Sequence, residues 1–165
     1  MPDRVVCNAS PLIFLGKINR LELLDNFKLY VPSQVEAEIA RGLKLRKEDA
    51  QQIIHYLDSR KIEAVKTPLL KNLPHFLGSG ERAVISLAVR NKIGIVLIDE
   101  AKARTVARFR GLKTKGTLGI LWDSFKSGMI DRETTELLSL DLMQKGYRIR
   151  EEILIEFLKR LKKIG

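Results

Sequence analysis

The sequence predicts an α/β protein built on a parallel sheet that helices cover on both faces. Short apolar segments of strand type alternate with longer segments of helical period, an order typical of strand–helix–strand units. The segment IGIVLI, residues 93–98, is apolar without a break, which indicates a strand buried on both faces. A chain of 165 residues is long enough for one domain with its own core.

The first half of the chain is expected to hold three strands. After a first strand over residues 4–7, the segment SPLIFLGKI is predicted as a helix that Ser10 caps and in which Pro11 takes the first position. We expect this helix to continue to residue 27. The elements predicted next are a second strand over 28–32, helices over 33–42 and 47–61, and a short third strand over 62–66.

The second half begins with a loop rich in proline and glycine, residues 67–80. The elements predicted after it are a helix over 81–91, the strand over 93–98, a basic helix, a short strand over 112–115 and three further helices. The last helix carries an apolar stripe that either closes the core or binds a second subunit; it consists of Ile149, Ile153, Phe157 and Leu161, beside Leu154 and Leu158. We expect a single domain over residues 1–165, with the helices from about residue 131 packing on it.

The composition favours a polyanionic partner. The formal net charge is +10 and the sequence pI is near 9.9, and nucleic acid is the commonest polyanion in the cytoplasm. Many lysines alternate with glutamates on helix faces, however, where charge mainly supplies solubility. The single cysteine, Cys7, cannot form an internal disulfide and favours a reducing compartment. The sequence contains no signal-peptide or membrane-spanning pattern, so we expect a cytoplasmic protein with no membrane partner.

Four side chains are expected to meet at one edge of the sheet, because the carboxyl ends of parallel strands lie together. Asn8 follows the first strand and Asp99 follows the strand over 93–98. Glu38 lies beside the apolar stripe of its helix, and Glu81 begins a helix so apolar that its first turn should be partly enclosed. Each also has a simpler interpretation, as a helix cap for Asp99, a partner of the helix dipole for Glu81, a solvated side chain for Glu38 and a turn residue for Asn8.

Taken together, these positions indicate a cation site. Acids that converge at one edge repel each other unless a cation neutralises them. Carboxylate oxygens without histidine or cysteine partners suit Mg²⁺ or Mn²⁺ rather than zinc, and His55 and His75 lie where structural or solvated roles are expected. A hard ion that keeps several waters can activate or orient water for attack on phosphorus, so the predicted chemistry is phosphodiester hydrolysis.

A basic stripe follows Asp99 and Glu100. Arg104 and Arg108 share a helix face at i, i+4, where like charges are slightly unfavourable unless a bound phosphate removes the repulsion. The alternative is a solvated basic face. The residues predicted to bind nucleic acid are Lys102, Arg104, Arg108, Arg110, Lys113 and Lys115.

The sequence resembles the PIN-domain family, in particular small prokaryotic proteins related to VapC toxins and described as predicted nucleic-acid-binding PIN proteins. The matching segments occur in the family's order and span nearly the whole chain: VVCNASPLIFLGKI, YVPSQVEAEI, GSGERAVISLA, VLIDEAKARTVARFRGLKTKGTLGIL and the helical end. The resemblance implies a compact three-layer α/β/α sandwich with a central, mostly parallel sheet of four to five strands.

The resemblance also implies a Mg²⁺- or Mn²⁺-dependent endoribonuclease of toxin type. Glu38, Glu81 and Asp99 match three of the family's four acidic positions and are the implied catalytic residues; with Asn8 they are the implied metal ligands. The implied partners are RNA, a protein antitoxin and a second copy of the chain in a homodimer. Glu100 is an implied accessory residue, as is Thr117, for which a helix cap is the alternative.

The departure from the family is Asn8, where the family usually has aspartate. An amide oxygen can ligate Mg²⁺ but brings no negative charge, so metal affinity should be weaker. The leading hypothesis is therefore a metal-dependent ribonuclease, impaired at Asn8, and the second is an RNA-binding or protein-interaction module that retains the fold without cleavage. A receiver-like signalling domain is a third hypothesis, but the third strand ends in VKTP, without the acid that a phosphoacceptor requires.

Overall fold

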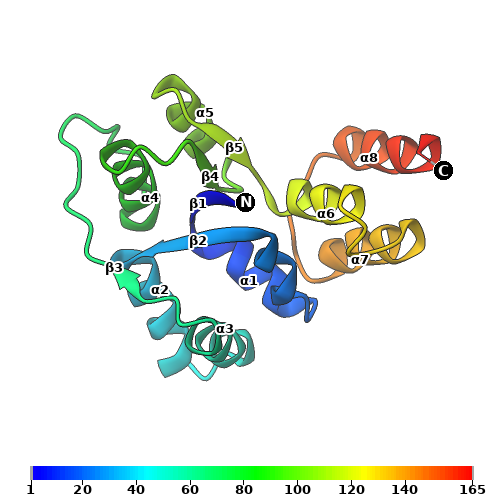
Figure 1. The fold of residues 1–165 in the computed structure, drawn as a ribbon, viewed down its shortest axis with the longest axis horizontal. Helices are drawn as coiled ribbons and strands as arrows, with labels where there is room; N and C mark the ends of the chain where they lie inside the picture. The colour runs from blue at the N-terminus through cyan, green and yellow to red at the C-terminus, as the bar shows by residue number, and fades with distance from the viewer. Residues whose placement is uncertain (1, 165) are drawn as a thin grey trace.

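The computed structural model describes residues 2–164 and contains a five-stranded sheet in the order β3-β2-β1-β4-β5 (Figure 1). Every neighbouring pair is parallel, as the alternation of strands and helices predicts. The strands are β1 (Asp3–Cys7), β2 (Phe27–Pro32), β3 (Ala64–Val65), β4 (Ile95–Leu97) and β5 (Lys113–Lys115). The helices are α1 (Ala9–Lys17), the 3-10 helix η1 (Leu21–Asn26), α2 (Ser33–Lys44), α3 (Glu48–Ser59), α4 (Ser79–Arg90), α5 (Ala101–Phe109), α6 (Thr117–Lys126), α7 (Arg132–Gln144) and α8 (Glu151–Lys163).

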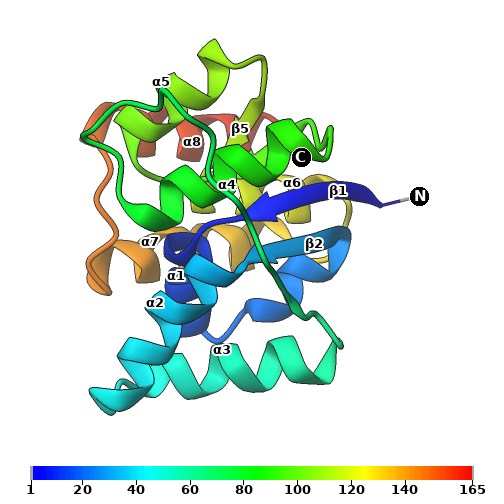
Figure 2. The same cartoon turned by 90° about the vertical axis from the view of Figure 1, so that its left-hand side faces the viewer.

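The helices cover both faces of the sheet because the chain reverses its direction across it. From β1 the chain moves outward to β2 and β3, and it then returns to β4 and β5 on the other side of β1. Right-handed connections place α1 and α3 on one face and α4 and α5 on the other, and Figure 1 shows this arrangement. Figure 2 shows α4 lying along β1 and β2, which it contacts.

The central strands form the middle of the core. Val5 and Val6 of β1 are fully buried, as are Val96, Leu97 and Ile98 in and after β4. Neighbouring residues on a strand point to opposite faces, so both faces of β4 are covered and the burial expected from IGIVLI is confirmed.

The start and end of α1 differ from the prediction. The helix begins at Ala9, so Asn8 rather than Ser10 precedes it, and Pro11 is its third residue. It ends near Asn19, which has a φ of 56° in the left-handed region that stops helices. The prediction of one continuous helix to residue 27 is therefore wrong, and η1 takes its place, with Leu21, Leu23 and Leu24 buried.

The three C-terminal helices gather beside the β5 end of the sheet (Figure 1). α7 packs against α6, and α8 packs against α7. Of the stripe predicted on the last helix, Phe157 and Leu161 are buried, whereas Ile153 is 42% exposed, so α8 closes the core with only part of that stripe. None of the helices within residues 2–164 is both long and apolar enough to cross a membrane.

Candidate functional site

Asn8 and Asp99 lie on either side of the point where the connections of the sheet change direction. Asn8 follows β1 and Asp99 comes shortly after β4, and these two strands are neighbours. The backbone N–H of Asn8 donates to the carbonyl oxygen of Leu97 at 3.0 Å. In an open parallel sheet the connections diverge at such a point and leave a crevice outside the carboxyl ends of the strands, where ligands bind.

The Asp99 carboxylate accepts four hydrogen bonds from protein groups. Oδ1 accepts from the backbone N–H of Thr117 at 2.7 Å and from the hydroxyl of Tyr147 at 2.8 Å. Oδ2 accepts from the hydroxyls of Ser10 and Thr117, both at 2.7 Å. Asp99 therefore binds Thr117, the first residue of α6, at a helix end that a negative charge stabilises. It does not cap α5, the helix that follows it in the sequence.

Close packing keeps this network in place. A methyl group on Gly116 would lie 2.9 Å from Asp99 Oδ1 and 3.4 Å from the Tyr147 oxygen, so only glycine fits there without a shift. Burial raises the pKa of the Tyr147 hydroxyl, and the charge of Asp99 and the hydrogen bond to it raise that pKa further. The hydroxyl therefore stays protonated and remains a donor to Asp99.

Glu81 lies in a different electrostatic environment. It sits in the first turn of α4, and its Oε1 accepts the backbone N–H of Gly78 at 3.0 Å. Its pKa is raised, first by burial and then by the negative charges of Glu100 and Glu38, against the lowering effect of the Gly78 hydrogen bond. The negative charges of Glu38 and Glu100 therefore oppose ionisation of Glu81 at the start of α4.

Asn8 faces the start of the same helix. A methyl group on Gly80 would lie 3.1 Å from Asn8 Oδ1, so the amide oxygen lies close against the first turn of α4. Asn8 is buried, and within residues 2–164 its side chain makes no hydrogen bond to cap α1. The Asn8 amide is therefore not used to cap α1 and lies between the end of β1 and the start of α4.

The other predicted site residues have distinct positions. Glu100 is the N-cap of α5, where Oε1 accepts the N–H of Lys102 at 3.2 Å, so Glu100 takes the capping role considered for Asp99. Glu38 is exposed on α2, so its carboxylate has solvent access despite its place beside the apolar stripe. Thr117 is buried and next to Asp99; the residue preceding α6 is Gly116, so Thr117 is not the helix cap.

The four predicted metal ligands carry oxygen atoms of the kind that a hard cation binds, but the oxygens of one of them, Asp99, are already occupied by hydrogen bonds. The atoms with which Glu81, Glu38 and Asn8 can bind a metal are oxygens, which suit Mg²⁺ or Mn²⁺. Both oxygens of Asp99 are already held by protein donors. In the part of the chain that the structure describes, no three acidic, histidine or cysteine side chains are placed to hold one ion together.

The predicted basic stripe divides along α5. Lys113 lies at the amino end of the three-residue strand β5, and Lys115 lies at its carboxyl end. Arg104, Arg108 and Lys115 line a cleft that Asp99 also lines. Lys102, Arg110 and Lys113 lie outside it.

The sequence matches a known family over the residues that form the sheet and the candidate site. Residues 4–163 match a family described as a PIN domain. The chain belongs to the PIN-domain family. No curated protein matches the sequence well enough to count as a relative.

Two residues of this PIN domain's edge were not found from the sequence. Ser10 was interpreted as a helix cap, yet its hydroxyl donates to Asp99, 89 positions later. Tyr147 reaches Asp99 across 48 positions, from the segment between α7 and α8. Its aromatic ring meets Phe14 of α1 edge-on, with the ring centroids 5.1 Å apart. No local sequence pattern predicts partners so far apart in the chain. The one available signal was the position of Tyr147, a polar aromatic residue, in a basic segment.

Proposed function

We propose that this PIN-domain protein is a metal-dependent endoribonuclease with a weakened cation site. The observation that carries the proposal is the position of Glu81 in the first turn of α4, against which the Asn8 amide oxygen packs; burial, Glu100 and Glu38 raise the pKa of Glu81 there. A divalent ion relieves repulsion of this kind. When bound, such an ion supplies a water of lowered pKa that can attack phosphorus.

The side chains have separate tasks in this proposal. Glu81 and Glu38 are charged ligands, and Asn8 contributes a neutral amide oxygen from the end of β1. Asp99 positions its surroundings, because its oxygens hold Ser10, Thr117 and Tyr147. With Asn8 in place of a carboxylate, the site carries one negative charge fewer than the usual family pattern, so the expected metal affinity is low.

A second function is favoured by the same edge of the sheet. Asn8 brings no charge, and Asp99 is already held by four hydrogen bonds. Both features suit a PIN domain that binds RNA without cutting it. Relationship to VapC toxins, a protein antitoxin and a homodimer stay predictions from the resemblance under either function.

The test compares RNA cleavage by the native chain, Glu81→Gln and Asn8→Asp in Mn²⁺, in Mg²⁺ and in EDTA. We expect slow cleavage by the native chain with Mn²⁺ and none in EDTA. Asn8→Asp should bind Mn²⁺ at least about tenfold more tightly, because it adds a unit charge next to the ion, and should cleave faster. Calorimetric titration with Mn²⁺ reads metal affinity independently of cleavage.

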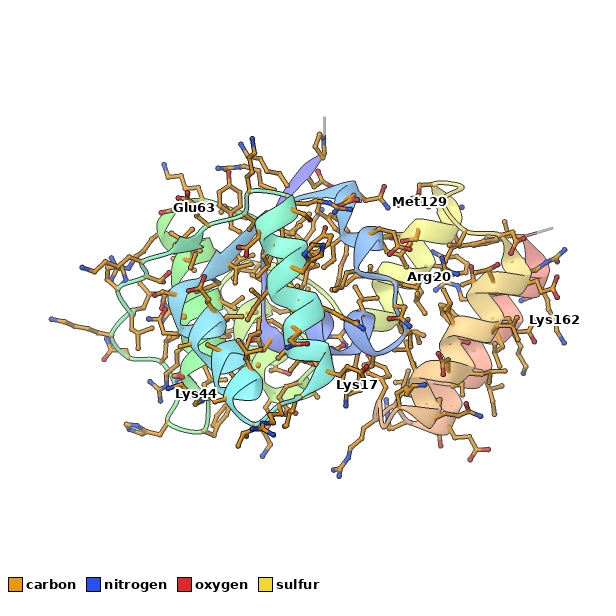
Figure 3. The ribbon with its side chains drawn as sticks, turned by 90° about the horizontal axis from the view of Figure 1, so that it is seen from below. Lys17, Arg20, Lys44, Glu63, Met129 and Lys162 are labelled. Atoms are coloured by element: carbon orange, nitrogen blue, oxygen red, sulfur yellow. The ribbon has the colours of Figure 1, made fainter. Side chains whose placement is uncertain are left out.

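Glu63→Gln is the matched control for Glu81→Gln. Glu63 is exposed and precedes β3, at the opposite edge of the sheet (Figure 3). The control should cleave at the native rate and Glu81→Gln should not. Equal cleavage by all variants, or cleavage that survives EDTA, would overturn the metal-dependent proposal. RNA binding in EDTA without cleavage by any variant would support the second function instead.

A further inference from the structure

One cleft lies between the sheet edge and the C-terminal helices. It has a volume of about 810 Å³ and opens beside Asp99. One wall comes from α5 and β5, and the other comes from α6, α8 and the segment before α8. Ile149, Ile153 and Phe157 of the apolar stripe predicted on the last helix belong to this second wall.

One set of cleft residues is strongly basic. The basic residues that line the cleft are Arg104, Arg108, Lys115, Arg148, Arg150 and Arg160. Lys115 is paired with Asp123. None of the five arginines lies within ion-pair distance of a carboxylate in residues 2–164. Arg104 Nε is buried and has no hydrogen-bond partner there, so the cleft contains a donor that its protein neighbours leave unused.

A second set of cleft residues is apolar and aromatic. Leu118, Ile149 and Ile153 line the cleft beside Trp122 and Phe157, whose ring centroids are 6.0 Å apart. The guanidinium carbon of Arg160 lies 4.9 Å from the centroid of the Trp122 ring. Arg160 is exposed, so the outer face of its guanidinium group is open to a further flat ring. Bases of single-stranded RNA stack on guanidinium planes and aromatic rings in this way.

We infer that this cleft binds a single-stranded segment of RNA and leads it to the edge of the sheet at Asp99. The phosphates lie along Arg104, Arg108 and Arg148, and one base stacks on Arg160 above Trp122. A duplex keeps its bases paired and stacked inside and cannot offer one to this platform, so the cleft selects single strands. The inference rests on the proposed function for its choice of RNA, but binding in the cleft requires no cleavage.

Two matched pairs of variants test the inference. On α5, Arg108 lines the cleft and Arg110 does not; on α8, Arg160 lines the cleft and Lys162 does not. Figure 3 shows Lys162 at the outer end of the molecule. All four side chains are exposed, so replacement by alanine should leave the fold intact. Unfolding in urea confirms that each variant is folded.

Binding is measured in EDTA by fluorescence anisotropy with a short labelled single-stranded RNA, and with the same RNA annealed to its complement. Arg108→Ala should lower the slope of log affinity against log salt by about 0.7, the share of one phosphate on a single strand. Arg110→Ala should leave that slope unchanged. Arg160→Ala should weaken single-strand binding about tenfold and reduce the preference over the duplex, whereas Lys162→Ala should keep that preference.

The outcomes separate this inference from the proposed nuclease. If the two variants of each pair differ in RNA binding as expected but no variant cleaves RNA in Mn²⁺, the inferred RNA-binding cleft is supported and the nuclease proposal fails. If RNA is cleaved but Arg108→Ala matches Arg110→Ala, or the duplex binds as tightly as the single strand, the cleft is overturned and the nuclease stands. If no RNA binds in EDTA, the cleft is overturned, and the nuclease is overturned with it when no variant cleaves RNA in Mn²⁺.

Discussion

Asp99 and Glu81 lie at the same edge of the sheet, yet their carboxylates have opposite surroundings. Asp99 accepts four hydrogen bonds at 2.7–2.8 Å, which match both of its oxygens with protein donors. Glu81 accepts one, from Gly78, and has Glu38 and Glu100 as charged neighbours that raise its pKa. One carboxylate is stabilised by the fold, and the other is destabilised by its neighbours.

This difference teaches that a shared position does not give two acids a shared role. A carboxylate held by several donors contributes to stability, and it must break those bonds before it can bind a ligand. A carboxylate surrounded by like charges costs stability and gains most from a cation. Unfolding experiments without divalent ions should therefore separate the two residues, even before any activity is measured.

The largest effect is expected for Asp99→Ala. The change leaves the N–H and the hydroxyl of buried Thr117 without their acceptor, together with the hydroxyls of Ser10 and Tyr147. Unsatisfied buried donors cost about 1–3 kcal/mol each, so we expect a loss of at least about 3 kcal/mol in the free energy of unfolding. The measurement is the midpoint of urea unfolding at constant slope.

Asp123→Ala is the control for that loss. Asp123 belongs to α6 and pairs with Lys115, but both side chains are about one-third exposed. Such a pair contributes about 1 kcal/mol or less. Equal destabilisation by the two variants would show that the Asp99 network has no special weight.

A smaller effect is expected when a methyl group is added beside the Asp99 carboxylate or beside the Asn8 amide. In Gly116→Ala the methyl would lie 2.9 Å from Asp99 Oδ1, and because the backbone there has a φ of −92°, the strain is steric only. We expect a loss of about 2 kcal/mol, typical of overpacking. In Gly80→Ala the methyl lies 3.1 Å from Asn8 Oδ1, but helix propensity gains about 0.5–1 kcal/mol.

Thermal and urea unfolding of the two glycine variants should therefore differ clearly. Gly80→Ala is expected to stay within about 0.5 kcal/mol of the native chain. A loss in Gly80→Ala as large as that in Gly116→Ala would mean that the Asn8 side chain is held as firmly as the Asp99 carboxylate and cannot move to bind a ligand.

The smallest effect is expected for Glu81→Gln. Glutamine keeps an oxygen that can accept the Gly78 N–H, and it removes the charge that Glu38 and Glu100 repel. Without divalent ions we expect the free energy of unfolding to stay unchanged or to rise by up to about 0.5 kcal/mol. Urea unfolding in EDTA measures it, with Glu63→Gln as the comparison. A clear loss of stability in Glu81→Gln alone would show that its charge is held by the fold.

The sequence predicted the sheet because its signals are local. An apolar run such as residues 93–98 is buried wherever the sheet forms, and Asn8 and Asp99 follow strands that parallel pairing brings side by side. The left-handed conformation at Asn19 was missed, because asparagine tolerates a helical conformation as well and only the packing of η1 decides between them.

The site was harder to predict because its polar contacts are long-range. The sequence placed Asp99 at the correct edge, but whether its oxygens face Glu81 or Thr117 depends on side-chain directions that no spacing encodes. The basic stripe was similarly predicted as one surface, yet Lys115 lines the cleft beside Asp99 and Lys113 does not. Arg148 and Arg150 line the cleft because the segment between α7 and α8 lies beside it, a placement that no sequence pattern predicts.

The hydrogen bond from the Tyr147 hydroxyl to Asp99 connects the C-terminal part of the chain to the edge of the sheet where the candidate site lies. A version cut after Gln144 would keep all five strands and every acid at the sheet edge, and by sequence it would pass for an intact domain. It would nevertheless lack the hydrogen bond from Tyr147 to Asp99 and the part of the cleft lining that follows residue 144. A premature stop codon or a protease that trims this tail would thus alter the site from a distance, while leaving its acidic residues in place.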